Sequence, residues 1–235
     1  MLEIIADLHI HTIASGHGAD TIRTVCEFAC KKNLKAIAIT DHGPGFPGGA
    51  GITYFMSLHR LANNIIFPLK IITGIEDDIK NRKGELTISD DILKGLEIVM
   101  TGCHPFTWIA EQRKRVRTDA VVNAITKGCV KVFTHPVGTY IDIELKPVLD
   151  AVISAGAALE LNTSKIDKTD VIMDLLEKCG TNNIPIVVNS DAHTAEEVGS
   201  FDEACRLLDE TGFPEHLVVN RSKESIKSFF DIVWK

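Results

Sequence analysis

The sequence predicts an α/β fold in which helices cover a parallel sheet, and within that class it favours a closed, TIM-like (β/α) barrel. Short runs rich in β-branched residues alternate with helix-period segments along all 235 residues, a pattern typical of βα repeats. Histidines and carboxylates follow most of these runs directly, as in barrels whose polar groups gather at one end. The alternation by itself also fits an open doubly wound sheet. No linker or internal repeat divides residues 1–235, which predicts a single domain.

Strands are predicted where short apolar runs are rich in β-branched residues. In chain order they are Leu2–Leu8, Lys35–Thr40, Leu69–Glu76, Glu97–Thr101, Val130–Thr134, Ala157–Leu161, Pro185–Asn189 and a weaker Leu217–Val219. Helices are predicted where apolar residues recur about every three to four positions. They include Thr21–Asn33, Asp119–Lys127, Glu144–Ser154, Asp170–Lys178 and Ala195–Glu210. The irregular stretches Gly43–Gly51 and Phe106–Thr118 follow strands and are predicted as βα loops.

The composition is that of a globular chain with an ordinary core, since 45% of residues are hydrophobic and 24% are charged. A net charge of −7 argues against duplex nucleic acid as a partner. No apolar run reaches the roughly 20 residues that span a bilayer, so no membrane association is expected. The first residues show no secretory signal, and the six cysteines form no C-x-x-C pair. We therefore expect free thiols and a cytoplasmic protein.

Most of the histidines lie at or just beyond a strand end, and two carboxylates occupy equivalent places. The first strand leads into His9 and His11, and the third ends at Glu76. The complete set is His9, His11, His17, His42, Glu76, His104, His135, Asp191 and His193. Because the carboxyl ends of parallel barrel strands open onto one face, we expect these nine side chains to converge there. The other two histidines, His59 and His216, lie away from any strand end, and His59 is expected on a helix.

This pattern points to a metal site. Side chains alternate along a strand, so His9 and His11 point to the same side and form a compact chelate. A catalytic zinc takes about three protein ligands, so nine ligands can serve three divalent ions with one carboxylate bridging two of them. Imidazoles with carboxylates suit zinc, with iron or manganese as alternatives. Cys103 alternates away from His104 and is not expected to be a ligand.

Other polar residues near the strand ends have less defined roles. No serine or cysteine nucleophile stands out, which predicts attack on the substrate by a metal-bound hydroxide rather than by a catalytic side chain. Asp7 and Asp41 are expected to orient the imidazoles of the ligands. The basic residues Arg113, Arg115 and Arg117 are placed in the loop after the fourth strand. They form either a solvated face or a cationic rim that recruits an anionic substrate.

These residues resemble the PHP (polymerase and histidinol phosphatase) family. The resemblance runs through DLHIHT, ITDHGP, GIE, GCHP, THP, ELNTS and SDAHT. It is closest to the small stand-alone YcdX-type phosphatases, through EDDIKNRKGE and FDEACRLLDETGFPEHLVVN. The sequence TGCHP departs from the glycine-hydrophobic-histidine-glutamate pattern of that branch, which bears on substrate contacts rather than on metal ligands.

The resemblance implies a distorted seven-stranded (β/α) barrel with a trinuclear metal centre at the carboxyl ends of the strands. It assigns His9, His11 and Asp191 to a first ion and His17, His42 and His193 to a second. It assigns His104 and His135 to a third, with Glu76 bridging the first and third ions. The implied activity is hydrolysis of a small phosphomonoester.

Two other functions remain open. An amidohydrolase-like metal hydrolase of a C–N or ester bond also uses an H-x-H pair at a strand end, although a third metal group from His104 and His135 counts against it. A non-catalytic metal-binding module of a polymerase assembly is the second alternative. The complete ligand set and the lack of an appended domain count against it. The sequence leaves the natural substrate and homo-oligomerisation open.

Overall fold

A parallel sheet forms the centre of the fold, and its seven strands lie side by side in chain order. The computed structural model describes residues 2–137, 141–166 and 169–234. The strands are β1 (Ala6–Asp7), β2 (Ala36–Ile39), β3 (Lys70–Glu76), β4 (Ile98–Thr101), β5 (Val132–Phe133), β6 (Ala158–Asn162) and β7 (Ile186–Asn189). Every neighbouring pair is parallel. This order confirms the nearly closed barrel and excludes a doubly wound sheet, in which the strand order reverses.

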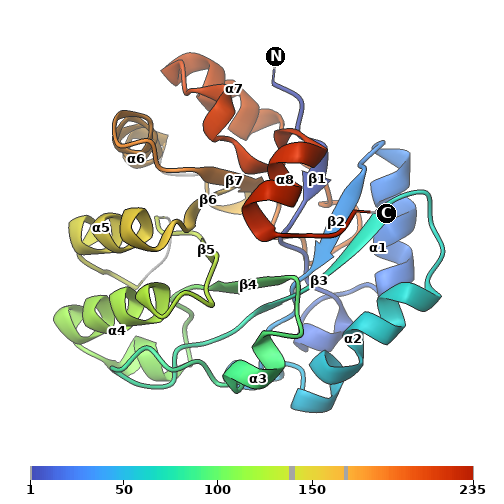
Figure 1. Cartoon of the computed structure of the whole chain (residues 1–235), viewed down its shortest axis with the longest axis horizontal. Helices are drawn as coiled ribbons and strands as arrows, with labels where there is room; N and C mark the ends of the chain where they lie inside the picture. The colour runs from blue at the N-terminus through green and yellow to red at the C-terminus, as the bar shows by residue number, and fades with distance from the viewer. Residues whose placement is uncertain (1, 138–140, 167–168, 235) are drawn as a thin grey trace.

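Helices surround the sheet (Figure 1). They are α1 (Ile22–Lys31), α2 (Ile52–Asn64), α3 (Asp90–Leu93), α4 (Lys114–Thr126), α5 (Leu145–Ala155), α6 (Thr169–Thr181), α7 (Asp202–Thr211) and α8 (Lys223–Phe230). Helix α1 begins after Thr21, whose hydroxyl oxygen accepts the Thr24 amide proton, and α5 ends at Gly156 in the left-handed conformation. Among the described residues, no helix is both long and apolar enough to cross a membrane.

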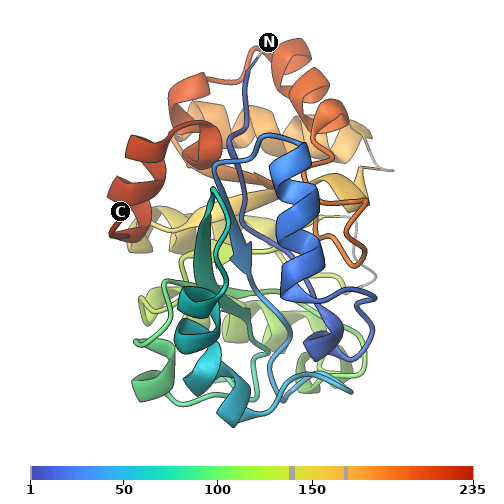
Figure 2. The same ribbon diagram turned by 90° about the vertical axis from the view of Figure 1, so that its right-hand side faces the viewer.

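The core has two apolar layers. The outer layer lies between the strands and the surrounding helices. The inner layer fills the barrel with residues such as Leu8, Ile72 and Met100, and α8 contributes Ile226 and Phe230 to it. Helix α8 therefore closes the end of the barrel at which the strands begin (Figure 2).

The barrel has a seam between β1 and β7, and among the described residues a single parallel bridge, Ile10 with Ala192, joins the segments just beyond their carboxyl ends. Asn220 is fully buried in this seam. Its amide nitrogen donates to the carbonyl oxygens of Ala6 (2.8 Å) and Val188 (2.5 Å), and its amide oxygen accepts from the Val188 N–H (3.0 Å). Asn220 thus pairs backbone groups that a strand-to-strand ladder would otherwise pair, and Asn189 adds a bond by accepting from the Leu8 N–H at 3.0 Å.

We expect Asn220→Ala to lower the free energy of unfolding by about 3 kcal/mol, because each lost hydrogen bond contributes about 1 kcal/mol and leaves buried backbone groups unpaired. Urea denaturation at one fixed metal concentration measures the change. Asn182→Ala is the control, because the Asn182 side chain donates to Lys178 in an exposed position. Equal midpoints for the two variants would show that the seam does not need Asn220.

Three sequence predictions are wrong. Leu217–Val219 is not a strand, because its ends lie in short 3-10 helices and Val218 makes one isolated bridge to Ile186. The predicted helix Ala195–Glu210 begins later, at Asp202, since Gly199 adopts a φ of 70° that interrupts it. The third correction concerns the basic segment from Arg113 to Arg117, which is helical from Lys114 onward as the first turn of α4.

Candidate metal centre

The fold brings the nine predicted ligands together at the carboxyl ends of the strands. Most of them are buried. His17 is exposed and His193 is half-buried, which places them at the rim of the cluster. Two of the nine have a backbone in the left-handed region that non-glycine residues seldom adopt, His135 with a φ of 30° and Asp191 with a φ of 56°. Such backbone strain often accompanies functional sites.

The first predicted ligand group is compact. The Nε2 atoms of His9 and His11 lie 3.0 Å apart. Glu76 Oε2 lies 3.2 Å from His9 Nε2, and Asp191 Oδ1 lies 3.2 Å from His11 Nε2. These four side chains therefore aim their lone-pair atoms at one small region.

The third predicted group forms around the other oxygen of Glu76. Glu76 Oε1 lies 3.1 Å from His104 Nε2 and 3.0 Å from His135 Nε2, and these two nitrogens are 3.2 Å apart. Each carboxylate oxygen of Glu76 thus faces a different set of imidazoles, which is the placement that a bridging carboxylate needs. Thr134 also donates to Oε1 at 2.6 Å.

The second predicted group lies beside the first, and the rings of His17, His42 and His193 are neighbours, with the His17 centroid 5.2 Å from that of His42 and 4.5 Å from that of His193. His17 Nε2 lies 2.7 Å from His193 Nε2, as the assignment requires. His11 also approaches this group, because nitrogens of His11, His42 and His193 all lie within 4.8 Å of one another. His42 directs its Nδ1 towards Glu76 Oε2 at 3.3 Å, so the second group adjoins the first rather than standing apart from it.

Oxygen atoms hold the outer nitrogens of several imidazoles. His9 Nδ1 lies 2.7 Å from Glu160 Oε1, and His104 Nδ1 lies 2.8 Å from Asp78 Oδ1. Sequence reasoning assigned no role to either carboxylate. A signal was present in each case, because Asp78 is two residues beyond Glu76 and Glu160 lies within the apolar strand β6. An acidic residue in a buried strand needs a partner.

Asp41 reaches an imidazole through another residue. Its carboxylate accepts from Ser15 Oγ at 2.7 Å and from the Tyr54 hydroxyl at 2.6 Å. Ser15 Oγ in turn lies 2.9 Å from His11 Nδ1. Asp7 does not orient an imidazole directly. In the part of the chain that the structure describes, its side chain accepts from Ser190 and from the Gly199 N–H, so it fixes the backbone that leads into Asp191.

The buried charges depend on one another. Burial raises the pKa of the Glu76 carboxyl, but the imidazoles of His104 and His9 outweigh it and hold this pKa well below its usual range. Burial lowers the pKa of His104, whereas Glu76 and Asp78 raise it to about 10. The carboxylates thus favour a positive charge between themselves and the imidazoles, and a metal cation can take the place of that proton.

The donor set fits metal ions. Within the described ranges, His42 Nδ1 and Glu76 Oε2 are buried and form no hydrogen bond, although they lie 3.3 Å apart. Buried polar atoms are seldom left unpaired unless another group completes them. Imidazole and carboxylate donors suit borderline divalent metals such as zinc. Cys103 packs in the outer apolar layer and takes no part.

The glycine-rich loop Gly43–Gly51 packs against this cluster. The Phe46 ring stacks on His42 with centroids 4.0 Å apart and an interplanar angle of 14°. A Cβ at Gly43 would lie 2.2 Å from Asp77 Oδ1, so glycine is needed for the close approach. The loop therefore brings an aromatic wall to the imidazoles.

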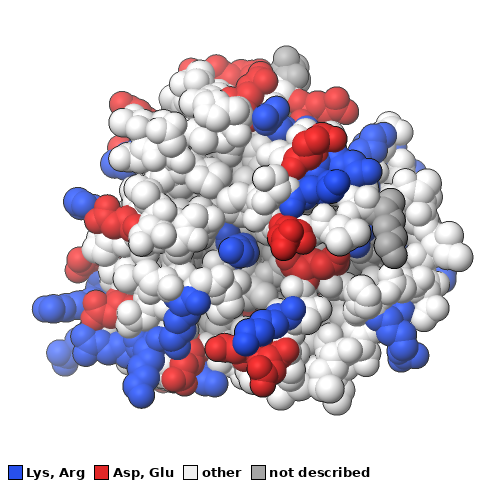
Figure 3. All heavy atoms as spheres, viewed as in Figure 1, with Lys and Arg blue, Asp and Glu red and all other residues white. Residues whose placement is uncertain are grey.

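The predicted basic residues divide into two kinds. Arg113 and Arg115 are exposed, and Lys and Arg side chains gather over α4 at the lower left of Figure 3. The Arg117 side chain is fixed by hydrogen bonds, because its guanidinium donates to the carbonyl oxygens of Ala110 and Asp142. Sequence reasoning missed Lys165, whose Nζ lies 3.8 Å from Asp191 Oδ2.

Several known proteins are similar to this chain in sequence or in fold. Residues 7–164 match the PHP domain family, and residues 179–201 match a PHP-associated family. A probable phosphatase from Caldanaerobacter subterraneus subsp. tengcongensis is 35% identical over 233 residues, which are 97% of this chain and 91% of that protein. A probable phosphatase from Shewanella frigidimarina is 33% identical over 233 residues, with 97% and 93% covered. The fold resembles the crystal structure of histidinol phosphate phosphatase from Lactococcus lactis subsp. lactis Il1403, complexed with zinc, L-histidinol and phosphate (TM-score 0.61, 20% identity, 89% of this chain and 94% of that chain).

Proposed function

The chain belongs to the PHP domain family, and from this premise we propose that it is a metal-dependent phosphatase that hydrolyses a small phosphomonoester. The names of its curated relatives support this activity. Residues 179–201 contain β7, and β7 lies in the same sheet as the strands of the PHP match. This shared sheet supports residues 1–235 acting as a single domain.

The observation that carries the proposal is the position of Glu76 between two groups of imidazoles. We assign His9, His11 and Asp191 to one divalent ion and His104 and His135 to another, with Glu76 bridging them. His17, His42 and His193 complete a third site. Zinc is our first choice, with iron or manganese as alternatives. The zinc in the Lactococcus lactis structure supports that choice.

Divalent ions held by these residues would supply Lewis-acid stabilisation of the phosphate and would activate a water molecule as the nucleophile. The chain's own residues position these groups. Glu160 and Asp78 fix the rings of His9 and His104, and the Glu76 charge would reduce repulsion between neighbouring cations. Lys165, 40% exposed beside Asp191, adds positive charge where a phosphate oxygen can approach.

Hydrolysis of p-nitrophenyl phosphate, compared with a panel of amides and lactones, separates this activity from that of an amidohydrolase-like enzyme. Preferential turnover of the phosphate ester supports the proposal, and preferential turnover of an amide or lactone would overturn it. Recovery of a replicative polymerase in a pull-down, with no hydrolysis of any panel member, would instead favour the polymerase-assembly module.

Protein purified without chelator is expected to carry about three transition-metal ions per chain, because nine ligands supply about three for each ion. Elemental analysis by mass spectrometry measures this ratio against protein concentration. A preparation supplemented with zinc, iron or manganese that never exceeds one ion per chain would contradict the trinuclear assignment.

Lys165→Met is expected to raise the KM for a phosphomonoester about tenfold and to change kcat less, because an exposed cation contributes mainly to substrate binding. Replacing both Arg113 and Arg115 with Ala should have a smaller effect on KM that disappears at high salt, since exposed charges are screened within about 10 Å at 0.1 M. Steady-state kinetics at two ionic strengths compares the variants. An unchanged KM for Lys165→Met would remove this lysine from the substrate site.

A further inference from the structure

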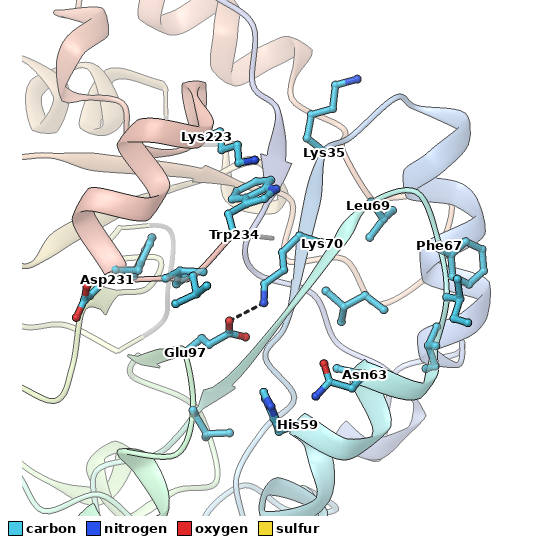
Figure 4. A pocket seen from close by; sticks show the side chains of 18 of the residues that line it. Lys35, His59, Asn63, Phe67, Leu69, Lys70, Glu97, Lys223, Asp231 and Trp234 are labelled. Carbon is cyan, nitrogen blue, oxygen red and sulfur yellow. Dashed lines mark ion pairs between the residues drawn. The ribbon is translucent and has the colours of Figure 1, made fainter.

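A cavity of about 1190 Å³ opens at the end of the barrel opposite the histidine cluster. Its residues lie where strands begin, since Lys35 precedes β2, Lys70 opens β3 and Glu97 precedes β4. Residues 65–69, which follow α2, form one wall, and residues 231–234, which follow α8, form the other (Figure 4). The predicted metal ligands follow the opposite ends of the strands, so this cavity is separate from the metal centre. It is large enough for a small organic ligand, because pockets that bind such ligands typically measure about 300–1,000 Å³.

The charge around this cavity is mainly positive, although the whole chain carries a net charge of −7. Its lining contains the basic residues Lys35, Lys70, Lys94 and Lys223 and the acidic residues Glu97 and Asp231. Lys70 Nζ is already paired with Glu97 Oε1 at 2.8 Å. Within the described ranges, Lys35 and Lys223 have no carboxylate partner. A concave site with unpaired positive charge attracts anions.

One wall of the cavity offers an aromatic face. Lys223 Nζ lies 5.3 Å from the centre of the Trp234 ring, so a cation and an indole are presented together. Figure 4 shows Phe67, Leu69 and the amide of Asn63 on the other side of the cavity. A flat ring can stack on an indole.

We propose that this cavity is a second binding site, for a small anion that carries a planar heteroaromatic ring, with the chemistry of a nucleoside monophosphate. The ring stacks on Trp234, and Lys223 neutralises the phosphate. The proposal does not depend on the metal centre or on phosphatase activity, because none of these residues contributes to the histidine cluster.

Tryptophan fluorescence tests this site directly. The chain has two tryptophans, and Trp108 lies in the segment after β4, at the metal end. In a Trp108→Phe protein, Trp234 is therefore the sole reporter. The ligand to titrate is the phosphonate analogue of AMP, whose C–P bond resists hydrolysis, with adenosine and inorganic phosphate as partial ligands. We expect saturable quenching by the analogue and an affinity at least about tenfold above that for either part alone.

Charge variants locate the site. Lys223→Gln is expected to weaken binding of the analogue at least about tenfold, and Asn63→Glu to abolish it by placing a carboxylate in the cavity. Lys146→Gln is the matched control, because Lys146 is 84% exposed on α5 and pairs with Asp150. Circular dichroism verifies that each variant is folded. Absence of saturable quenching, equal affinity for inorganic phosphate alone, or unchanged binding by Lys223→Gln would overturn the proposal.

Discussion

Glu76→Gln is expected to reduce phosphatase turnover at least about a hundredfold, which corresponds to about 2.7 kcal/mol in the activation barrier. The two oxygens of Glu76 face separate imidazole groups, with His9 Nε2 at 3.2 Å from one and His135 Nε2 at 3.0 Å from the other. Glutamine keeps the size of the side chain but removes its charge, and an amide nitrogen cannot bind a cation. Steady-state kinetics with p-nitrophenyl phosphate measures the loss.

The same variant should lose one or two of its metal ions, about the number that Glu76 would contact as a bridging ligand, and keep its fold. The remaining ligands lie on other strands. His216→Gln is the control, because His216 is exposed in the 3-10 helix Glu215–Leu217, away from the cluster. Full metal content together with near wild-type turnover in Glu76→Gln would mean that the third strand contributes no ligand.

Glu160→Gln should have the second largest effect, a loss of about 10- to 100-fold in metal affinity. Glu160 Oε1 lies 2.7 Å from His9 Nδ1 and accepts from Asn189 at 2.8 Å, while Oε2 accepts from the His135 N–H at 2.8 Å. A glutamine amide would direct its own donors at groups that already donate. The orientation of His9 and the backbone at His135 would then both be disturbed.

Competition with a chromophoric chelator measures this affinity. Glu177→Gln, a change of the same chemistry at an exposed position on α6, is the control and should leave affinity unchanged. If Glu160→Gln retained wild-type affinity, the carboxylate would be a buried structural group rather than a support for the metal ligands.

Local sequence patterns predicted the parts of this protein that depend on local geometry. Alternation along a strand predicted that His9 and His11 point to the same side, and their nitrogens are 3.0 Å apart. Recurrence of polar residues after strands predicted that Glu76 and Asp191 approach these histidines. Both predictions need only the period of a strand and the common end of a parallel barrel.

Long-range partners could not be predicted in this way. His9 and Glu160 are separated by 151 positions in the chain, and no periodicity relates them. The role of Asn220 could not be predicted for the same reason. The apolar run Leu217–Val219 has the composition of a strand, but its buried residues pack where the barrel closes. The first turn of α4 could not be predicted from apolar periodicity, because that turn carries mainly basic residues.

The seam between β1 and β7 delays closure of the barrel during synthesis of the chain. The Ala6 carbonyl oxygen accepts a hydrogen bond from the side chain of Asn220, which is 214 positions later in the chain. The barrel therefore cannot close until nearly all of the chain has left the ribosome. At about 5–20 residues per second, β1 spends on the order of 10–40 s without this partner. Asp191 also emerges long after His9 and His11, so the first metal site is completed late in synthesis. An unpaired strand edge exposed for that time is prone to aggregation, and a chaperone that shields the N-terminal strands would raise the yield of folded protein.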